Sequence, residues 1–285
     1  MNILILGANG LIGHTVFRYL RKKTAFTVYG TIRNSGLRNY FDALDQNCIF
    51  PEVECGHFDS LAPILSLIKP NIVINCVGIT KHKPSSENPL IAIPINSLLP
   101  HQISEYCKLF NARLIHISSD CVFSGMEGGY SEDDLPNATD LYGKSKALGE
   151  VSDAKNTITL RTSTIGHELG TTFGLLEWFL SQNDSCVGFN RAIFSGLPTI
   201  ELARVIAEFV IPNKDLHGLY NLAGEPIAKY ELLKLIAHLY KKSINIDLDD
   251  KFSINRSLDS RKFEVATGYT PPKWEALINS MKNFK

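Results

Sequence analysis

The sequence predicts an α/β protein in which a doubly wound parallel sheet carries a smaller carboxy-terminal lobe. Two observations predict this class. The first half of the chain alternates short, β-branched apolar runs with longer segments of helical period. In addition, a glycine-rich turn follows the first apolar run directly, which is where such sheets open their first helix.

Five apolar runs have the length and composition of buried strands. Pro70 precedes the third run, and Pro100 and the pair Asp140 and Lys144 stand near expected helix starts. These boundary residues agree with the hydrophobic periodicity. The first helix is expected from His14 to Lys22. The predicted strands are Ile3–Leu6, Phe26–Thr31, Ile72–Cys76, Leu114–Ser118 and Ile158–Arg161.

The alternation loosens beyond about Gly166, which indicates a change of architecture. A mixed segment reaches Gly196, and Pro198-Thr199 then opens a helix to about Val210 with Thr199 as its N-cap. A last strand over Gly218–Gly224, a helix over about Ala228–Lys241 and a polar loop to about Ser260 complete the expected order.

These elements predict two domains. Residues 1–165, together with about 196–224, would form the dinucleotide-binding domain. Residues 166–285 would form a substrate-binding lobe over the carboxyl edge of the sheet, where doubly wound folds bind their ligands.

Composition excludes several classes of protein. Lys plus Arg equals Asp plus Glu at 29 each, so no global field favours nucleic acid or an anionic membrane. No apolar run approaches the ~20 residues that cross a bilayer. The six cysteines include no Cys-x-x-Cys pair, and no histidine cluster has metal-ligand spacing, so we expect no metal. The start lacks a basic region and a cleavage site, which predicts a cytoplasmic protein.

The glycine-rich turn predicts a dinucleotide site of the Rossmann type. Glycines at 7, 10 and 13 let the chain turn tightly, let a diphosphate approach the backbone and let helix pack on strand. The alternative is an ordinary tight turn. The cofactor-binding residues predicted here are Gly7, Asn9, Gly10, Leu11, Ile12 and Gly13.

Arg33 decides the expected choice of cofactor. An NAD-specific protein usually carries a carboxylate after its second strand, whereas Arg33 can pair with a 2'-phosphate. We therefore favour NADPH and leave NADH open. The alternative is that Arg33 is an ordinary solvated residue.

Further cofactor contacts are expected along the same edge of the sheet. Asp59 would accept from the adenine amine or cap the helix near Leu61. Cys76, Val77 and Gly78 expose backbone after a strand. Asn96 would contact the cofactor or satisfy backbone groups in the sheet.

Three polar residues form a predicted catalytic set. Tyr142 and Lys146 are four apart and share one helix face, so the ammonium can favour the ionised phenol and bring its pKa, ~10 when unperturbed, into range. Ser119 ends a strand and can hydrogen-bond the same substrate oxygen. Tyr142 is then a proton donor, and Tyr142 and Lys146 also border the cofactor.

The glycine turn, Ser119, Tyr142 and Lys146 together resemble the extended short-chain dehydrogenase/reductase superfamily over essentially the whole chain. Within it, the chain is similar to dTDP-4-dehydrorhamnose reductases in four segments, and a stretch through Asn75–Thr80 and Ile95–His101 looks closer to a branch that reduces UDP-linked 4-keto-6-deoxy-N-acetylhexosamines. The four segments are Ile117–Gly125, Leu141–Glu150, Leu160–Ser163 and Arg256–Asp259 with Thr267–Trp274.

The sequence also departs from these relatives. They commonly carry an aromatic residue and an acid where this chain has Cys121 and Ser124, which puts the shape of the sugar pocket in doubt. Dehydratases of the superfamily usually carry an Asp-Glu pair after the central hydroxyl residue. Here Asp120 is present but Cys121 replaces the glutamate, so simple reduction fits better.

The resemblance implies an NADPH-dependent reductase of a nucleotide-linked 6-deoxysugar in surface polysaccharide or O-antigen biosynthesis, and a homodimer. A nucleotide-sugar epimerase with tightly bound NAD, and a non-catalytic NADP-binding regulatory subunit like that of methionine adenosyltransferase, are the alternatives. Cationic side chains would hold the diphosphate or base, and each could equally be an ion-pair partner. The predicted substrate residues are Ser119, Asp120, Arg161, Arg191, Arg256 and Asp259.

Overall fold

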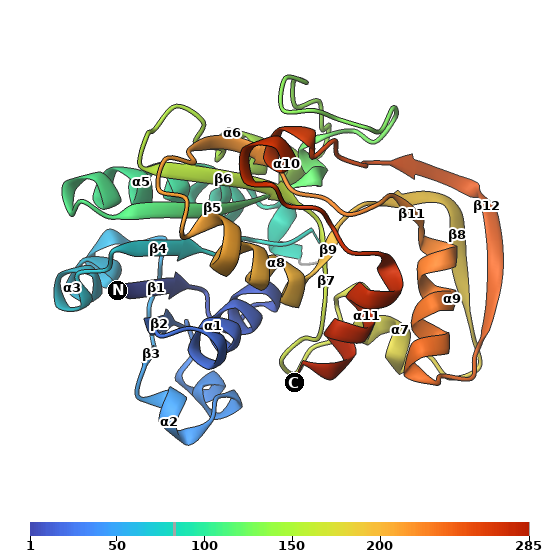
Figure 1. Ribbon diagram of the computed structural model, residues 1–285, viewed down its shortest axis with the longest axis horizontal. Coiled ribbons are helices and arrows are strands. Elements are labelled where there is room, and N and C mark those ends of the chain that lie inside the picture. Colours follow the sequence, from blue (N-terminus) through green and yellow to red (C-terminus); the bar gives the residue numbers. More distant parts are fainter. Residues whose placement is uncertain (82–83, 285) are drawn as a thin grey trace.

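The computed structural model describes residues 1–81 and 84–284, and it confirms the α/β fold. Its centre is a seven-stranded sheet in the order β10-β6-β5-β4-β1-β2-β3, parallel throughout (Figure 1). The strands are β1 Asn2–Leu6, β2 Thr27–Thr31, β3 Ile49–Phe50, β4 Ile72–Asn75, β5 Arg113–Ser119, β6 Thr157–Thr162 and β10 Gly218–Asn221.

Both faces of this sheet are buried, which explains why its strands read as continuous apolar runs. Along β1, Ile3 and Ile5 pack on one face, and Leu4 and Leu6 pack on the other. The first face is covered by α1 Leu11–Lys23 and α8 Thr199–Val205, and the second by α3 Phe58–Ile68 and α5 Leu99–Leu109.

A second, smaller sheet in the order β11-β8-β12 lies to the right of the central sheet in Figure 1. It consists of β8 Ser185–Phe194, β11 Ile227–Ala228 and β12 Asn245–Asn255, with α7 Leu175–Ser181, α9 Lys229–Tyr240 and α11 Trp274–Asn283 beside it. The arrow of β1 points toward this sheet, so the small sheet lies at the carboxyl side of the central strands.

The polar loop expected up to Ser260 is wrong, because β12 occupies most of it. β12 pairs in parallel with β8, from Asn245 opposite Ser185 to Asn255 opposite Ile193. It is an edge strand with most of its side chains exposed, so aspartates and a lysine stand among its apolar residues. Its composition therefore resembles that of a loop.

The helix after Pro198 forms as expected, but Thr199 does not cap it. Pro198 is the N-cap residue, and the Thr199 hydroxyl instead lies 3.1 Å from that of Thr15 on α1. The helix continues into a π-helical stretch, Ile206–Val210. Remaining short elements are α2 Ala43–Gln46, α4 Pro89–Ala92, α6 Leu141–Leu148, α10 Arg261–Thr267, β7 Thr164–Ile165, β9 Leu197–Pro198 and the 3-10 or π turns Ser35–Tyr40, Pro84–Glu87, Ile93–Leu98 and Asp120–Val122.

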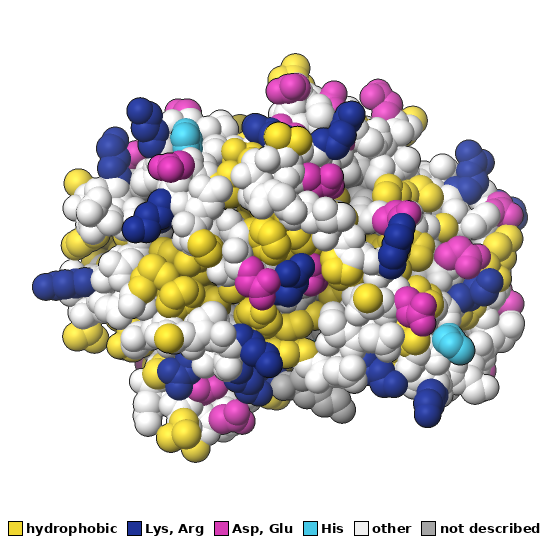
Figure 2. All heavy atoms as spheres, in the orientation of Figure 1, with side chains coloured by type: hydrophobic (Ala, Val, Ile, Leu, Met, Phe, Trp, Pro, Cys, Tyr) yellow, Lys and Arg dark blue, Asp and Glu magenta, His cyan; other side chains and the backbone are white. Residues whose placement is uncertain are grey.

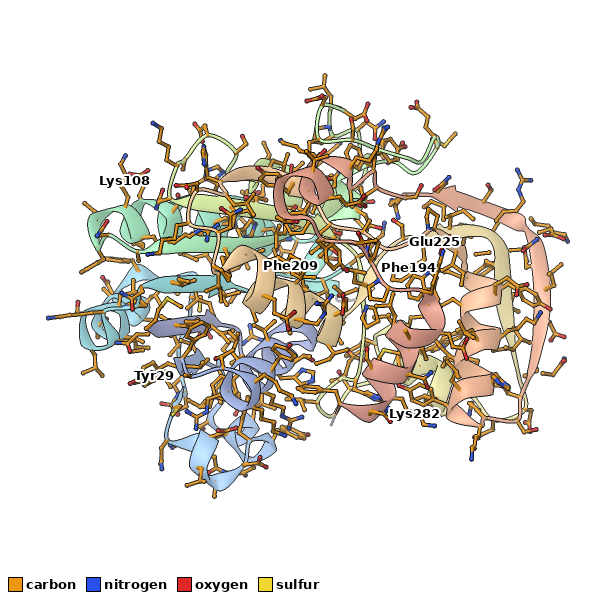
Figure 3. The ribbon with its side chains drawn as sticks, viewed as in Figure 1. Tyr29, Lys108, Phe194, Phe209, Glu225 and Lys282 are labelled. Carbon is orange, nitrogen blue, oxygen red and sulfur yellow. The ribbon has the colours of Figure 1, made fainter. Side chains whose placement is uncertain are left out.

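The central sheet and the small sheet share one apolar core. Phe194 of β8 packs on Trp274 of α11 at 5.7 Å between ring centroids, and the Trp274 indole donates to the Glu225 carbonyl at 2.7 Å. Phe194 and Glu225 lie where the two parts meet (Figure 3). The same cluster includes Ile5 and Phe17 near the amino terminus.

On the face seen in Figure 2, basic and acidic side chains are interspersed, and apolar side chains gather over its middle. This agrees with the balance of charges in the sequence. Among the described residues, none of the helices is both long and apolar enough to span a bilayer.

Candidate active site

The glycine-rich turn joins β1 to α1. Each of its three positions is occupied by glycine for a different physical reason. Gly7 has φ +76°, a left-handed conformation that disfavours side chains. A Cβ on Gly13 would lie 2.1 Å from the Gly7 carbonyl oxygen, so α1 packs against the turn only with glycine there. A Cβ on Gly10 would meet only the Gly7 oxygen, at 3.4 Å, which leaves its outer side open.

This turn fits a dinucleotide. Gly10 is the N-cap of α1 and supplies no side-chain cap, so the first amides of a 13-residue helix remain available to an anion. The Ala8 amide donates to the Thr31 carbonyl at 2.8 Å, and the missing Cβ of Gly7 leaves room for Val77. The ends of β2 and β4 therefore adjoin the turn, as a nucleotide lying across them would require.

Arg33 and Asp59 are both exposed beside this edge. Arg33 follows β2 by two residues and makes no hydrogen bond or ion pair with any residue that the structure describes. Asp59 lies in the first turn of α3, which begins at Phe58 with His57 as N-cap, so the alternative that Asp59 caps this helix is wrong. Its carboxylate stays free for the predicted adenine contact.

Asn96 has the structural role that the sequence left open. Its side chain is 1% exposed, accepts from the Ile79 amide at 2.8 Å and donates to the Ile79 carbonyl at 3.2 Å and to the Ser145 hydroxyl at 3.1 Å. It therefore ties the segment after β4 to α6. Gly78 adjoins it, with a would-be Cβ 3.5 Å from the Asn96 Oδ1.

Ser119 and Tyr142 meet at the end of β5. Ser119 Oγ donates to Asp120 Oδ1 at 3.1 Å, accepts from the Cys121 amide at 3.1 Å and lies close enough to the Tyr142 phenol to influence its pKa. Asp140 caps α6 by accepting from the Gly143 amide at 2.8 Å, which fixes the helix start beside Tyr142. Two predicted catalytic hydroxyls thus share one location.

The expectation that Lys146 brings the phenol toward ionisation is not met in this structure. Burial raises the pKa of Tyr142 above its usual range, negative charge on Asp120 raises it further, and the nearby Ser119 hydroxyl opposes the shift. Tyr142 is therefore a protonated phenol at neutral pH. That form is a proton donor, not a base.

Lys146 lies inside the protein, one turn of α6 beyond Tyr142. Its side chain is 5% exposed, and Nζ donates to the Ile117 carbonyl at 2.8 Å. Burial lowers the pKa of Lys146 to about 8, and negative charge on Glu150 and Cys76 opposes that fall. Burial also raises the pKa of the Cys76 thiol, to about 12. Near neutrality the opposing charge therefore comes from Glu150.

A group of charged side chains surrounds Asp120 beside Ser119. Burial raises the pKa of Asp120, while Arg256 and Lys229 lower it by their positive charge. Arg256 comes from the segment after β12, and its Nε donates to the Phe123 carbonyl at 2.8 Å. Lys229 is the first residue of α9. No sequence motif pointed to it, because only the packing of the small sheet brings it to this edge.

Three other predicted substrate residues lie elsewhere. Arg161 is 2% exposed and is held by Glu150 at 2.8 and 2.7 Å, so the prediction that it binds a diphosphate is wrong. Arg191 is exposed on β8. Asp259 is occupied by Arg261, which donates to it from its backbone amide at 3.0 Å and from its guanidinium.

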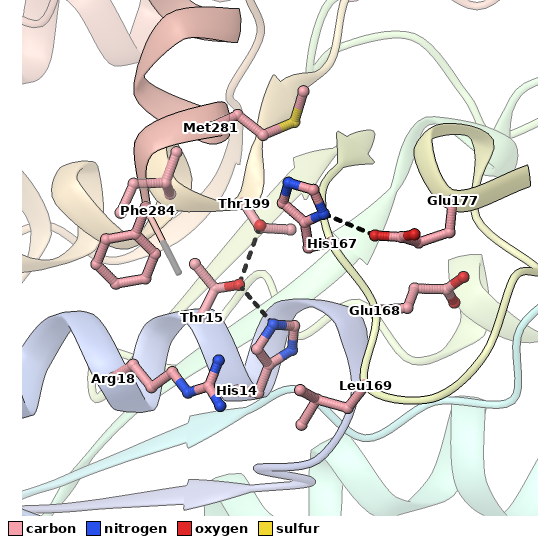
Figure 4. A pocket seen from close by; sticks show the side chains of 11 residues that line it. His14, Thr15, Arg18, His167, Glu168, Leu169, Glu177, Thr199, Met281 and Phe284 are labelled. Carbon is pink, nitrogen blue, oxygen red and sulfur yellow. Dashed lines mark hydrogen bonds and ion pairs between the residues drawn. The ribbon is translucent and has the colours of Figure 1, made fainter. Parts of the chain in front are cut away.

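A cavity of about 300 Å³ lies beside α1 and contains none of the predicted catalytic residues (Figure 4). His167 Nδ1 is hydrogen-bonded to Glu177 Oε1 at 2.6 Å, and the Thr15 hydroxyl is hydrogen-bonded to the Thr199 hydroxyl and to the ring of His14. Burial lowers the pKa of His14 to about 4, so its ring is neutral. The site at β5 and α6, not this cavity, holds the reactive groups.

A parallel sheet with a glycine-rich first turn and a Ser, Tyr and Lys set on β5 and α6 defines the extended short-chain dehydrogenase/reductase class, whose members are NAD(P)-dependent enzymes. The model of one family within this class, described as RmlD substrate binding domain, matches residues 1–283. The chain belongs to that family.

Individual relatives agree with this membership. The dTDP-4-dehydrorhamnose reductase of Aggregatibacter actinomycetemcomitans is 25% identical, with 99% of this chain and 98% of that protein aligned. Methionine adenosyltransferase 2 subunit beta of Mus musculus is 24% identical over 84% of this chain and 72% of that protein. A dTDP-4-dehydrorhamnose reductase from Bacillus anthracis, solved in complex with NADP, has a TM-score of 0.81 at 20% identity and covers 99% and 98% of the two chains.

Proposed function

We propose that the protein is an NADPH-dependent reductase of the 4-keto group of a nucleotide-linked 6-deoxysugar, serving surface polysaccharide biosynthesis. The observation that carries the proposal is that Ser119, at the end of β5, lies beside Tyr142, which is one turn of α6 from Lys146, at the edge where the dinucleotide turn opens. The family and its reductase members support the choice of substrate class.

NADPH is favoured over NADH by Arg33. Its guanidinium is exposed, lies just beyond β2 and has no partner among the described residues, so it is free to pair with a 2'-phosphate. The first amides of α1 would hold the diphosphate, and the segment Cys76–Gly78 would border the nicotinamide half.

The residues of the site divide the reduction among them. When bound, NADPH supplies the hydride that reduces the carbonyl carbon. Tyr142 donates its proton to the carbonyl oxygen, which becomes the hydroxyl of the product. Ser119 exchanges its bond to Asp120 for one to the same oxygen as negative charge develops there. Lys146 stabilises the phenolate that remains.

The neighbourhood of Asp120 supports reduction over dehydration. Burial raises the pKa of the Cys121 thiol to about 12, so Cys121 is neutral and cannot act as the second base of an elimination. Arg256 and Lys229 would bind the diphosphate of the substrate, because both place positive charge near Asp120 at this edge.

The test is the loss of NADPH absorbance with UDP- and dTDP-linked 4-keto-6-deoxysugars made in situ by a dehydratase. We expect substrate-dependent NADPH oxidation, and a kcat/KM about 100-fold to 10,000-fold lower in Tyr142→Phe. The variant should bind NADPH as the wild type does. Tyr106→Phe is the control, because Tyr106 lies on α5 and stacks on Phe58 of α3.

Two outcomes would contradict the proposal. The absence of turnover with every keto-sugar despite measurable NADPH binding would favour a binding subunit. A tightly held NAD that copurifies with the protein and does not exchange would favour an epimerase.

A further inference from the structure

We propose that Glu150, held by Arg161 and Ser118, is a positioning residue that keeps the buried ammonium of Lys146 charged. The inference rests on the proposed function for its catalytic consequence, whereas its electrostatic part rests on the contacts that hold Glu150 and Lys146 beside neighbouring residues of β5. No role for Glu150 is evident from the sequence, although it lies four residues beyond Lys146.

The Glu150 carboxylate is fixed by three donors. Ser118 Oγ donates to Oε1 at 2.7 Å, Arg161 Nε donates to Oε1 at 2.8 Å, and Arg161 Nη2 donates to Oε2 at 2.7 Å. The side chains of Arg161 and Glu150 are 2% and 6% exposed. These three donors, two of them on one guanidinium, hold the buried carboxylate in one orientation.

Strand β5 carries a hydrogen-bond partner of Lys146 and a hydrogen-bond partner of Glu150. Ile117 of β5 accepts from Lys146 Nζ through its carbonyl, and the next residue, Ser118, donates to Glu150. Arg161 lies opposite Ser118 on the neighbouring strand β6. Two adjacent strands and the end of α6 therefore fix the distance between the ammonium and the carboxylate.

The other groups around Lys146 do not supply negative charge near neutrality. Cys76 on β4 is a neutral thiol, and burial keeps the pKa of the His116 ring on β5 well below its usual value, with Lys146 and His101 lowering it further. Tyr142 on α6 is a protonated phenol. Arg161 on β6 is positive and is neutralised by Glu150. Glu150 is the one group in this set that favours the ammonium.

The decisive variant is Glu150→Gln, which keeps the shape of the side chain and removes its charge. We expect Lys146, which titrates at about 8 in the wild type, to titrate about one pH unit lower or further. Lysine NMR with isotope-labelled ε-carbons measures this, and Lys146→Met assigns the signal. Because the charged form is the active one and exists below its pKa, the alkaline fall of kcat/KM should move to lower pH by the same amount.

Glu201→Gln is a matched control. Glu201 is 5% exposed, accepts from Arg204 at 2.7 and 3.0 Å and from the Tyr269 hydroxyl at 2.9 Å, so it has the same kind of partners on α8. It should lose thermal stability as Glu150→Gln does, but leave the titration of Lys146 unchanged. Glu150→Asp retains the charge and should restore most of the pKa.

The proposal is overturned when Lys146 titrates at the same pH in Glu150→Gln and in the wild type. If Glu150→Gln does not fold, Arg161→Met retains the carboxylate, and the pKa of Lys146 must then stay at or above its wild-type value; a fall would overturn the proposal. Failure of the reductase reaction in the wild type would refute the proposed function, while the NMR titration would still decide the role of Glu150.

Discussion

At the scale of single residues, burial determines what each polar group can do. Tyr142 is protonated, burial lowers the pKa of Lys146 to about 8, and Cys76 and Cys121 are neutral thiols. A protonated phenol beside a charged ammonium suits proton donation to a carbonyl oxygen. The protonation states of the free site therefore suit the reduction of a carbonyl group.

The prediction for Arg33 concerns only the affinity for the cofactor. Arg33→Ala should weaken NADPH binding about tenfold, because an exposed but bidentate ion pair with a phosphate is lost. NADH has no 2'-phosphate, so its affinity should not change. Fluorescence titration with both cofactors measures the difference, and an equal loss for both would show that Arg33 does not read the phosphate.

At the scale of elements, different glycines of the β1–turn–α1 unit serve folding and cofactor binding. Gly13 is needed for α1 to approach the turn, whereas Gly10 leaves open space on its outer side. The two glycines look alike in the sequence. Their surroundings give them different consequences.

A pair of alanine substitutions tests this separation. Gly13→Ala places a methyl group 2.1 Å from the Gly7 oxygen and should cost at least about 2 kcal/mol in unfolding free energy. Gly10→Ala meets only one atom, at 3.4 Å, so it should melt near the wild-type temperature yet bind NADPH more weakly. Thermal melting and cofactor titration on both variants check the two expectations. Unchanged NADPH affinity in a folded Gly10→Ala would mean that the diphosphate does not approach there.

At the scale of the whole molecule, one core joins the central sheet to the small sheet. The cluster that contains Ile5 and Phe17 continues through Phe194 to Trp274 and Leu277. A continuous core predicts that the two parts lose their structure together.

Trp274→Ala tests this coupling. Trp274 is 6% exposed, packs on Phe194 and donates to Glu225, so its removal should cost about 3–5 kcal/mol. We expect a single unfolding transition at lower denaturant concentration, with fluorescence and circular dichroism coinciding. Two separate transitions in the wild type would show that the parts fold independently.

The sequence by itself determined the doubly wound sheet and the glycine-rich turn, and it placed Ser119 at a strand end and Tyr142 and Lys146 on one helix. These features are local: a buried parallel strand needs an apolar run, a tight turn needs glycine, and a helix places residues four apart on one face. The same locality explains why the edge strand β12, half polar and paired far along the chain, resembled a loop.

Only the tertiary structure decided which charged residues work together. Arg161 was expected at the substrate, but β6 places it beside Glu150 inside the protein, and α9 brings Lys229 to Asp120. It also showed that the Tyr142 phenol stays protonated in this structure. Charge pairing and pKa depend on burial and on neighbours distant in the chain, and neither is written in the spacing of residues.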